Sequence, residues 1–322
     1  MSVIAILTNP TSTSNKRNLE RIRAFTKKVD RIVHVEIGDI SEVEQALELI
    51  ERAGPPDALL INGGDGTVQA VLSVIFNRHP FPKGVPPLAV LPAGKTNMIA
   101  ADLGAPKNHL KVAQKLVDLI RSDAFSESLV QRNLLAVRFR EEQKEAIYAM
   151  FAGAASIVSA IHYTRRTVYA LPLPKGISHI FVFVRLCIDV LMGARSETGP
   201  ARVEEMKINL RGGGVFKGRF LLILITTLDQ ALLRFKTNFS GRKAGLRFLA
   251  VEGRAGAFFR AVFGIISGRL GKAFVPGSHI RQVDKMRISL EGEITLDGEL
   301  YTPVAGQDVL IDATQTCTFI SL

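Results

Sequence analysis

A glycine-rich segment with one carboxylate stands between a predicted strand and a predicted helix. The segment reads Asn62-Gly63-Gly64-Asp65-Gly66-Thr67, with a predicted strand at residues 58–62 leading into it and a helical pattern at residues 67–76 after it. Glycines let a backbone approach a phosphate closely, and a helix N-terminus offers unpaired N–H groups and partial positive charge. Asp65 alone would repel phosphate, so we interpret it as a Mg²⁺ ligand or as a group that orients the transferred phosphoryl. The alternative is a glycine turn in which Asp65 caps the helix.

Two further segments follow predicted strands in the same way. They read Thr8-Asn9-Pro10-Thr11-Ser12, after the first apolar run, and Pro92-Ala93-Gly94-Lys95-Thr96-Asn97, after apolar residues 88–91. In the second, Gly94 permits close approach and Lys95 supplies a point charge. Thr96 or Asn97 could cap a helix or bind ribose or phosphate. Loops at the carboxyl ends of parallel strands meet at one sheet edge, so the segments predict one anion site. An ordinary turn with an exposed lysine is the alternative.

A fourth segment with two carboxylates lies far from the others in the sequence. It reads Asp297-Gly298-Glu299 and stands between two predicted strands. On its own, an Asp-Gly pair between strands is typical of a hairpin turn, and that interpretation is favoured in isolation. The other three segments make a catalytic role for the two carboxylates a second hypothesis.

The elements that must position these residues fall into two groups. Apolar runs alternate with amphipathic stretches up to about residue 120, which predicts right-handed βαβ units and a parallel sheet covered on both faces. From about residues 125–129 onward, strands dominate. They are predicted at residues 134–140, 147–151, 202–211, 219–227, 246–251, 285–291, 294–296 and 315–320, with helices at 155–170, 177–192 and 255–270. The glycines at 212–214 predict a hairpin turn.

Charge and phenylalanine are unevenly distributed along the 322 residues. Hydrophobic residues make up 47% and charged residues 22%, which excludes a globally disordered chain. Residues 1–128 carry 15 basic and 14 acidic side chains, whereas residues 129–322 carry 26 and 16. The second part also holds 14 of the 18 phenylalanines. We therefore expect two domains, 1–128 and 129–322, the second of which meets something anionic.

The cysteines and the apolar runs limit which classes of protein the chain can belong to. Cys187 and Cys317 cannot build a disulfide framework or a four-ligand zinc site, and two reduced thiols are expected. The first residues lack the charged region and cleavage site of a signal peptide. No uncharged apolar run reaches the ~18 residues of a membrane span. We expect a cytoplasmic protein that is soluble or associates peripherally with a membrane.

Together these segments resemble the diacylglycerol kinase catalytic-domain family, which includes sphingosine, ceramide and bacterial lipid kinases. Asn9-Pro10 resembles its opening motif, residues 63–67 its nucleotide-binding signature and residues 91–97 its second nucleotide loop. Residues 258–270 with Pro276-Gly277, and then Asp297-Gly298-Glu299, resemble its closing motifs. The resemblance implies an α/β nucleotide domain with a parallel sheet, similar to phosphofructokinases and NAD kinases. A β-sandwich-rich lipid-substrate domain follows it, and the extreme C-terminus can pack back on the first domain.

The resemblance also implies roles for these residues. The protein would be an ATP-dependent lipid kinase with Mg²⁺, and its acceptor would be a hydroxyl such as that of diacylglycerol or a sphingoid base. Glu299 would take the hydroxyl proton, Asp297 would orient it or assist the metal, and Asp65 would help to place Mg²⁺. The nucleotide would be held by Asn9, Gly63, Gly64, Asp65, Gly66, Thr67, Gly94, Lys95, Thr96 and Asn97.

The sequence departs from the family pattern at several positions. Lys95 stands where Thr is usual and Met98 where Asp is frequent. Gln131 falls near a family Asp, and residues 242–245 lack the carboxylates that bind a structural Mg²⁺ in bacterial members. A soluble NAD or sugar-phosphate kinase, or a lipid-binding relative with little turnover, therefore stays open.

The expected partners are a lipid substrate and an anionic membrane surface, without nucleic acid. Docking is expected at residues 255–274, where apolar side chains at helical spacing lie among basic ones. The alternative is that this face packs on the core of its own domain. The basic side chains are Arg254, Arg260, Arg269 and Lys272, and the apolar ones are Phe259, Phe263, Ile266 and Leu270.

Overall fold

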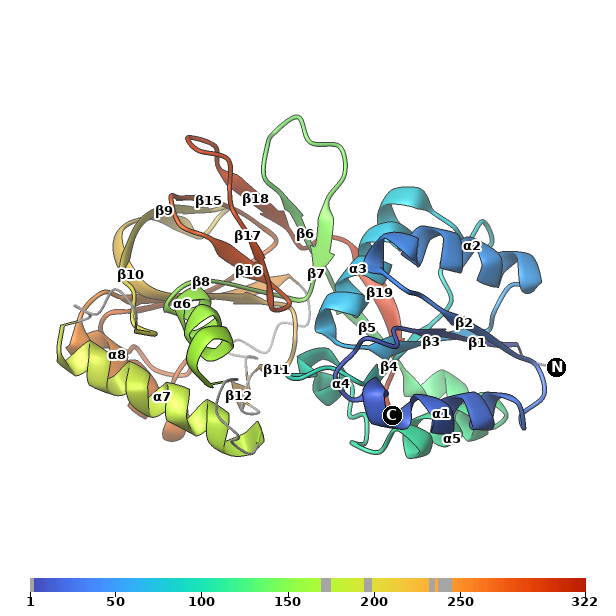
Figure 1. Cartoon of the computed structure of the whole chain (residues 1–322). Helices are drawn as coiled ribbons and strands as arrows, with labels where there is room; N and C mark the ends of the chain where they lie inside the picture. Colours follow the sequence, from blue (N-terminus) through green and yellow to red (C-terminus); the bar gives the residue numbers. More distant parts are fainter. Residues whose placement is uncertain (1–2, 169–174, 194–198, 232–234, 237–244) are drawn as a thin grey trace.

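The computed structural model describes residues 3–168, 175–193, 199–231, 235–236 and 245–322. Figure 1 shows two bodies side by side: a sheet with helices on both faces, and a larger sheet with helices on one side. An α/β region with a parallel sheet followed by a region rich in antiparallel strands confirms the predicted fold class.

The first sheet has six strands in the order β2-β1-β3-β4-β19-β5. Its first four strands are parallel: β1 (Ile4–Thr8), β2 (Ile32–Glu36), β3 (Ala58–Gly63) and β4 (Leu88–Pro92). Along β1, Ala5 and Leu7 face one buried cluster, and Ile4 and Ile6 face another. Both faces of this strand are therefore dry, as in a parallel sheet covered by helices on each side.

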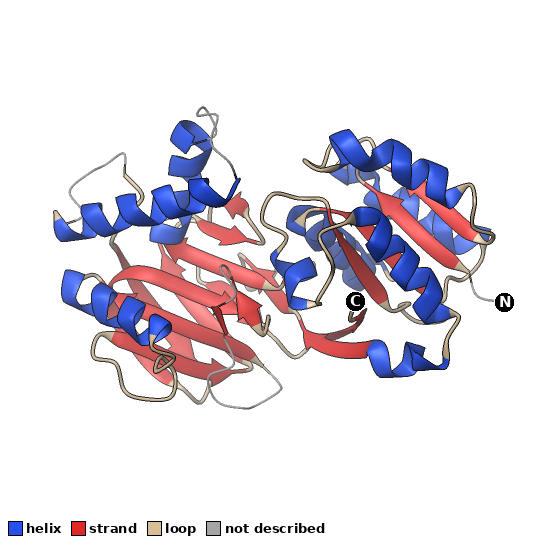
Figure 2. Ribbon diagram, turned by 90° about the horizontal axis from the view of Figure 1, so that it is seen from below, coloured by secondary structure: helices blue, strands red, loops and turns tan. Residues whose placement is uncertain are grey.

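The helices divide between the two faces of this sheet (Figure 2). The helices α2 (Val43–Ala53) and α3 (Asp65–Arg78) bury apolar side chains against one face. On the other face lie α1 (Asn15–Thr26) and α5 (His109–Ile120). The short α4 (Met98–Asp102) follows the loop after β4. Two 3₁₀ turns, Ile40–Glu42 and Asp123–Ser128, complete the connections.

Two strands from outside the first 128 residues complete this sheet. β5 (Leu129–Asn133) forms its edge, and β19 (Thr316–Ile320) lies between β4 and β5. β19 is parallel to β4 and antiparallel to β5. The backbone N–H of Leu322 then donates to Leu103 O at 2.9 Å. The chain thus leaves this sheet after Asn133 and returns to it at Thr316.

The second sheet is antiparallel and branches at its longest strand, β10 (Gly214–Thr226). The first half of β10 pairs with β9 (Glu204–Leu210), as predicted for a hairpin around Gly212–Gly214. Its second half pairs with β8 (Phe151–Ala155) on one side and β13 (Leu246–Glu252) on the other. The remaining strands are β6 (Leu135–Arg138), β7 (Ile147–Ala149), β14 (Ser278–Val283), β15 (Lys285–Leu290), β16 (Ile294–Leu296), β17 (Glu299–Tyr301) and β18 (Val309–Asp312).

The helices of the second region differ in length from the predictions. The helix predicted at residues 155–170 is α6 (Ser156–Tyr163), followed by a π-helical turn, Thr164–Val168, and then by residues outside the described part. α7 is Lys175–Leu191. α8 (Ala255–Ile266) ends four residues early, because Gly268 has a φ of 66° and the chain turns back to bury Leu270. A two-stranded ribbon, β11 (Gln230–Ala231) and β12 (Phe235–Lys236), lies apart from the main sheet.

Candidate active site

The two glycine loops at the carboxyl edge of the first sheet touch each other through their backbones. A methyl carbon placed on Gly94 would lie 2.7 Å from Gly64 Cα, and one placed on Gly64 would lie 3.0 Å from Gly94 Cα. The first distance excludes a side chain at position 94 unless one loop shifts, and the second leaves little room for one at position 64, so the close contact favours glycine in both loops. The sequence prediction attributed these glycines to phosphate binding alone, whereas the structure shows that they also bring the loops together.

Thr67 and Asn9 join the first loop to the end of β1. A methyl carbon on Gly63 would lie only 2.4 Å from Thr67 Cβ, so the threonine side chain lies where any other residue at 63 would place its own. Asn9 Nδ2 donates to Thr67 Oγ1 at 3.0 Å, and Asn9 Oδ1 accepts from the backbone N–H of Thr11 at 3.0 Å. Both side chains are buried. They hold the loop in shape while the first turn of α3 stays at the sheet edge.

The carboxylate of Asp65 caps α4 rather than its own helix. Asp65 is the first residue of α3, whose N-cap position is Gly64. Its two oxygens accept from the backbone N–H groups of Met98, at 3.1 Å, and Ile99, at 3.2 Å. Burial raises the pKa of Asp65, and these N–H donors oppose that shift. Capping of α3 by Asp65, the alternative reading of the sequence, is therefore wrong, because the side chain turns toward the second loop.

The second loop is fixed by its own asparagine. Asn97 adopts a left-handed conformation with φ of 52°, which asparagine tolerates better than most residues. Its Oδ1 accepts from Gly94 N–H at 2.7 Å, and its Nδ2 donates to Gly94 O at 3.0 Å. Asn97 thus shapes the loop, while Lys95 and Thr96 are exposed at its tip. Of the predicted residues in this loop, these two side chains face solvent.

The distant Asp297-Gly298-Glu299 segment is a tight turn between β16 and β17. Asp297 and Gly298 have positive φ values of 48° and 93°. The Asp297 carboxylate is buried and accepts from the backbone N–H of Phe151 at 2.9 Å and of Met150 at 3.1 Å. Burial, followed by the negative charge of nearby Asp65, raises the pKa of Asp297 well above its usual range. The two aspartates therefore lie near enough to repel each other, although they are far apart in the sequence.

Glu299 lies over the start of α3. Its Oε1 is 3.1 Å from the position that a methyl carbon on Gly66 would take. Unlike the two aspartates, it is 57% exposed, and Arg165 Nη2 lies 3.7 Å from its Oε2. Arg165 also donates to Gly298 O at 3.0 Å. The structure thus brings together Glu299, Asp297, Asp65 and the first glycine loop, and a carboxylate at this place can accept a proton from a group that reaches the loop.

Gln69 and Tyr301 connect α3 to this turn and were not identified from the sequence. Gln69 Nε2 donates to Leu296 O at 2.8 Å, and Tyr301 OH donates to Gln69 Oε1 at 2.7 Å. Burial, and then the negative charges of Glu299 and Asp297, raise the pKa of Tyr301 to about 12. Gln69 lies one helical turn after Asp65, on the same face of α3. That spacing was the available signal.

Comparison with protein-family models gives a match in the first region. Residues 3–125 match the diacylglycerol kinase catalytic domain. A search of curated proteins gave no match. The match supports a phosphotransferase, and it contains both glycine loops, but it ends before the turn at residue 297.

Solved structures agree with the kinase domain match over a longer stretch. A "putative diacylglycerol kinase" from Bacillus anthracis is 16% identical with a TM-score of 0.64, covering 100% of this chain and 97% of that one. A second structure under the same description has 17% identity, a TM-score of 0.60 and the same coverage. At these identities the likeness shows the fold, which here includes both regions.

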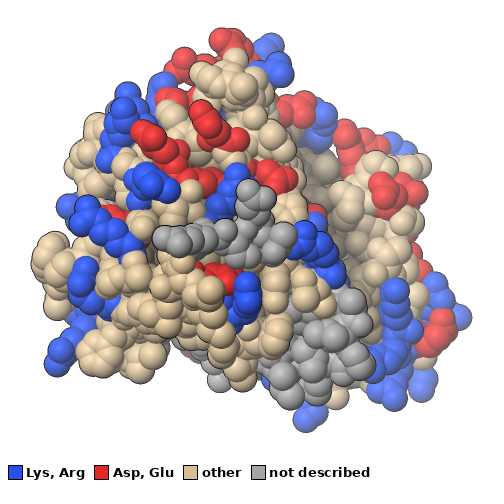
Figure 3. All heavy atoms as spheres, turned by 60° about the vertical axis from the view of Figure 1, so that its left-hand side comes forward, with Lys and Arg blue, Asp and Glu red and all other residues tan. Residues whose placement is uncertain are grey.

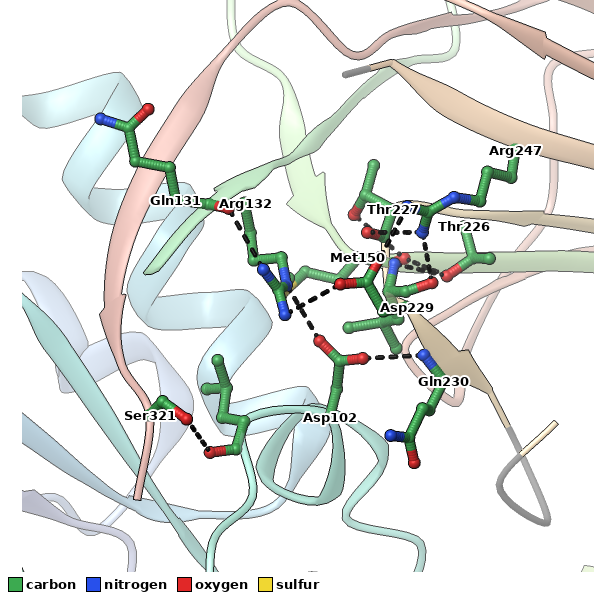
Figure 4. A network of polar contacts seen from close by, with 12 residues as sticks. Asp102, Gln131, Arg132, Met150, Thr226, Thr227, Asp229, Gln230, Arg247 and Ser321 are labelled. Atoms are coloured by element: carbon green, nitrogen blue, oxygen red, sulfur yellow. Dashed lines mark hydrogen bonds and ion pairs between the residues drawn. The ribbon is translucent and has the colours of Figure 1, made fainter. Parts of the chain in front are cut away.

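A polar network joins the kinase domain match to the second sheet behind the loops (Figure 4). Asp102, the last residue of α4, accepts from Arg132 Nε at 3.0 Å and from Gln230 N–H at 2.8 Å. Arg132 continues to Asp229 at 3.1 Å, and Asp229 to Arg247 at 2.6 Å. The carboxylate of Asp102 and the side chain of Arg247 are almost fully buried. Burial raises the pKa of Asp102, and the charge of Arg132 lowers it.

One position where the sequence departs from the family pattern, Gln131, is next to a residue of this network. Gln131 is exposed and its side chain points away, whereas the neighbouring Arg132 supplies a cation. Residues 242–244 lie outside the described part of the chain. Two guanidinium groups therefore neutralise the carboxylates at this junction.

A Mg²⁺ ion fits the pair of aspartates only with ligands from a nucleotide. Within the described ranges, no group of three His, Cys, Asp or Glu side chains could hold a metal ion. Asp65 and Asp297 are nevertheless two buried carboxylates that repel each other, and each retains lone pairs beyond its amide donors. Mg²⁺ in nucleotide enzymes is usually held by one or two carboxylates together with phosphates. The residues present thus match that arrangement, with Asp65 as the candidate ligand.

Proposed function

We propose that the protein transfers the γ-phosphate of ATP to the hydroxyl group of a lipid. The observation that carries this proposal is the position of Glu299, a half-exposed carboxylate over Gly66 at the first glycine loop. Phosphoryl transfer requires positioning and charge neutralisation more than an unusual nucleophile. A proton acceptor beside a phosphate-binding loop meets that requirement.

The first region would hold the nucleotide at its sheet edge. Its phosphates would lie on the backbone of Gly63–Thr67 and on the loop around Gly94, with Lys95 and Thr96 reaching them from the tip. Asp65 would hold Mg²⁺ together with the phosphate oxygens, with the negative charge of Asp297 nearby, and the ion would supply positive charge to the transferred group. Because Asn9 and Asn97 are engaged within their loops, their part is to keep the loop backbones in place.

Glu299 would accept the proton of the acceptor hydroxyl. It is the exposed carboxylate of the turn, and Arg165 Nη2 lies 3.7 Å from its Oε2. Asp297 is buried with both oxygens on backbone N–H groups, so it shapes the turn and adds negative charge near Asp65.

A lipid acceptor is supported by the surface of the second region. Phe263 and Ile266 of α8 are 62% and 77% exposed, and basic side chains lie nearby, as expected for docking at an anionic membrane. Phe258 and Ala261 instead pack inward, and Leu270 lies beyond the helix and is buried. The docking face therefore has fewer residues than the sequence predicted. No helix in the described part of the chain is long and apolar enough to cross a membrane.

An assay of ATP consumption with different acceptors tests the proposal. Diacylglycerol or sphingosine in mixed micelles should support turnover, and Glu299→Gln should remove it while ATP binding remains. Turnover with NAD or fructose 6-phosphate instead would make the protein a soluble kinase. Binding of lipid without turnover with any acceptor would make it a lipid-binding relative.

A further inference from the structure

A cavity of about 870 Å³ lies in the second region, away from the residues assigned to phosphoryl transfer. Its walls are α6 with the turn after it, the end of α7, strand β10 and the residues that lead into α8. Its volume is within the range of small-molecule sites. None of Asp65, Gly66, Asp297 and Glu299 is among its lining residues, so it is a separate site.

The cavity is lined by positive charge. Four arginines from four segments line it, Arg166, Arg202, Arg219 and Arg254, and none of the described lining residues is Asp or Glu. Arg202 and Arg254 have carboxylate neighbours outside the lining, Glu204 at 2.8 Å and Glu252 at 3.8 Å. No ion pair joins Arg219 to a described carboxylate. Four arginines around one cavity, with no described carboxylate paired to Arg219, favour an anion with several acceptor oxygens.

Apolar surface adjoins this basic cavity. Leu191, at the end of α7, lines it and is 68% exposed. The helices α7 and α8 pack against each other through a shared buried cluster (Figure 2). The two helices carry most of the exposed large apolar residues of the described chain, including Ile180, Phe181, Phe183, Val184, Ile188, Phe263, Ile265 and Ile266, and exposed Met192 directly follows α7. A soluble monomer seldom exposes so many on neighbouring helices.

The charge pattern indicates which molecule meets both features. Figure 3 shows uncharged residues across the lower part of this face, with Lys and Arg along its outer edge. A free phosphate would use the arginines but not the apolar residues, and a neutral lipid would do the reverse. A phospholipid with a negative headgroup can contact both the arginines and the apolar residues, because a single glycerol unit links its phosphate to its acyl chains.

We propose that the cavity binds the phosphate of an anionic phospholipid of the bilayer, whose acyl chains lie along α7 and α8. This inference rests on the proposed membrane docking, and it is independent of phosphoryl transfer. The site belongs to a lipid of the membrane itself, because the acceptor must reach Glu299 and no lining residue lies in that turn. Arg165 contacts Gly298 and the next residue, Arg166, lines the cavity, so an occupied cavity also restrains the segment that contacts the turn.

Charge reversal with a matched control tests the basic part of the site. Arg219→Glu is compared with Lys217→Glu, which makes the same change of charge two residues earlier on β10 but outside the lining. The full chain is sedimented with vesicles of phosphatidylcholine, with or without phosphatidylglycerol. A basic residue at a membrane surface contributes about fivefold in binding, so the reversal at 219 should lower binding to anionic vesicles by at least about tenfold. The control should lose less than about twofold. Equal losses in both variants would overturn the proposal, since they would reflect overall charge alone.

Calorimetry without ATP separates lipid from phosphate. Monomeric short-chain phosphatidylglycerol should bind at least about tenfold more tightly than inorganic phosphate, and Arg219→Glu should abolish that binding. Leu191→Ser should weaken the lipid and leave inorganic phosphate unchanged. Equal affinities of the two ligands would overturn the assignment to a phospholipid. Since neither measurement involves turnover, loss of kinase activity in the Glu299→Gln variant cannot account for either result.

Discussion

The two glycine loops and the outer sides of α7 and α8 are built in opposite ways. In the loops, polar side chains that could reach a ligand form hydrogen bonds within the protein instead. Asn97 bonds Gly94, Asn9 bonds Thr67, and Asp65 bonds the start of α4. On α7 and α8, large apolar side chains such as Phe263 are exposed to solvent, and no described part of the chain covers them. A fixed group such as a phosphate can be met by a rigid backbone. A fluid surface is met by exposed area and charge, which need no exact register.

The largest effect should come from the one exposed carboxylate of the loop site. Glu299→Gln keeps the shape of the side chain but cannot accept a proton, so turnover should fall by about 10²–10⁴-fold with unchanged ATP binding. Initial rates and calorimetry measure the two quantities. Near-normal turnover would place the base elsewhere and would remove the main distinction between Glu299 and its buried neighbours.

The polar network behind the loops should be the next most sensitive part. Arg132→Ala leaves the fully buried carboxylate of Asp102 without its cation, which should cost about 3 kcal/mol in unfolding free energy. Denaturant melts measure it. Arg287→Ala is the control, because its pair with Glu141 is exposed on both sides and should contribute below about 1 kcal/mol. Similar losses of unfolding free energy in the two variants would mean that the buried ion pair contributes no more to stability than the exposed one.

Lys95 tests whether the exposed tip of the second loop binds phosphate. A charge-assisted contact contributes about 1.5–3 kcal/mol, so Lys95→Ala should weaken Mg-ATP binding by roughly ten- to a hundredfold. Calorimetry with Lys83→Ala as a control for surface charge decides it. If both variants bind like the unaltered protein, the ligand contacts of this loop come from its backbone alone.

The contact between Gly64 and Gly94 tests whether the loop backbones must be held close together for ATP to bind. Gly94→Ala places a carbon 2.7 Å from Gly64 Cα, so one loop must shift, at about 1–3 kcal/mol. Stability and ATP affinity should fall together. Gly218→Ala on β10 has open space around it and should change neither. Lost affinity with unchanged stability would instead mean that the glycine matters only to the ligand.

The smallest effect concerns the link from α3 to the turn. The pKa of Tyr301 is about 12 in the folded protein and near 10 when unfolded, so the folded state retains the proton longer. The stabilisation from Tyr301 is full below pH 10 and is lost as pH rises toward 12. Tyr301→Phe should remove this part of the pH dependence and cost about 1 kcal/mol at neutral pH through the lost bond to Gln69. Melting curves from pH 8 to pH 12 compare the two proteins. An unchanged slope would contradict the assignment.

The sequence was informative wherever structure is set by neighbouring residues. The parallel strands, the positions of both glycine loops and the hairpin at 212–214 follow from local periodicity and turn chemistry. The branching of β10 does not, because two of its three partners, β8 and β13, are not its neighbours in the chain. The direction of the Asp65 side chain was also beyond local patterns, since it is decided by amides 33 and 34 residues away.

In the candidate site, too, local features were predictable from the sequence and long-range contacts were not. The type and spacing of Asp297 and Glu299 indicate a turn, but their position over α3 rests on contacts such as Gln69 to Leu296, across 227 residues. That Asp297 and Glu299 lie at the first glycine loop was expected only from the resemblance to a family. The residues alone left a hairpin turn as the favoured interpretation, and Tyr301 and Gln69 gave no motif at all.

The insertion of β19 between β4 and β5 has a consequence for how the protein folds. The first sheet is built from residues 4–133 and 316–320, so its interior gap can close only after the whole second region has been synthesised. Such long-range closure raises the contact order and slows folding. Until then β4 and β5 have no common neighbour, and each presents an unpaired edge that can associate with other chains. The two glycine loops should therefore acquire their final geometry late, and fragments that stop before Thr316 should aggregate rather than bind ATP.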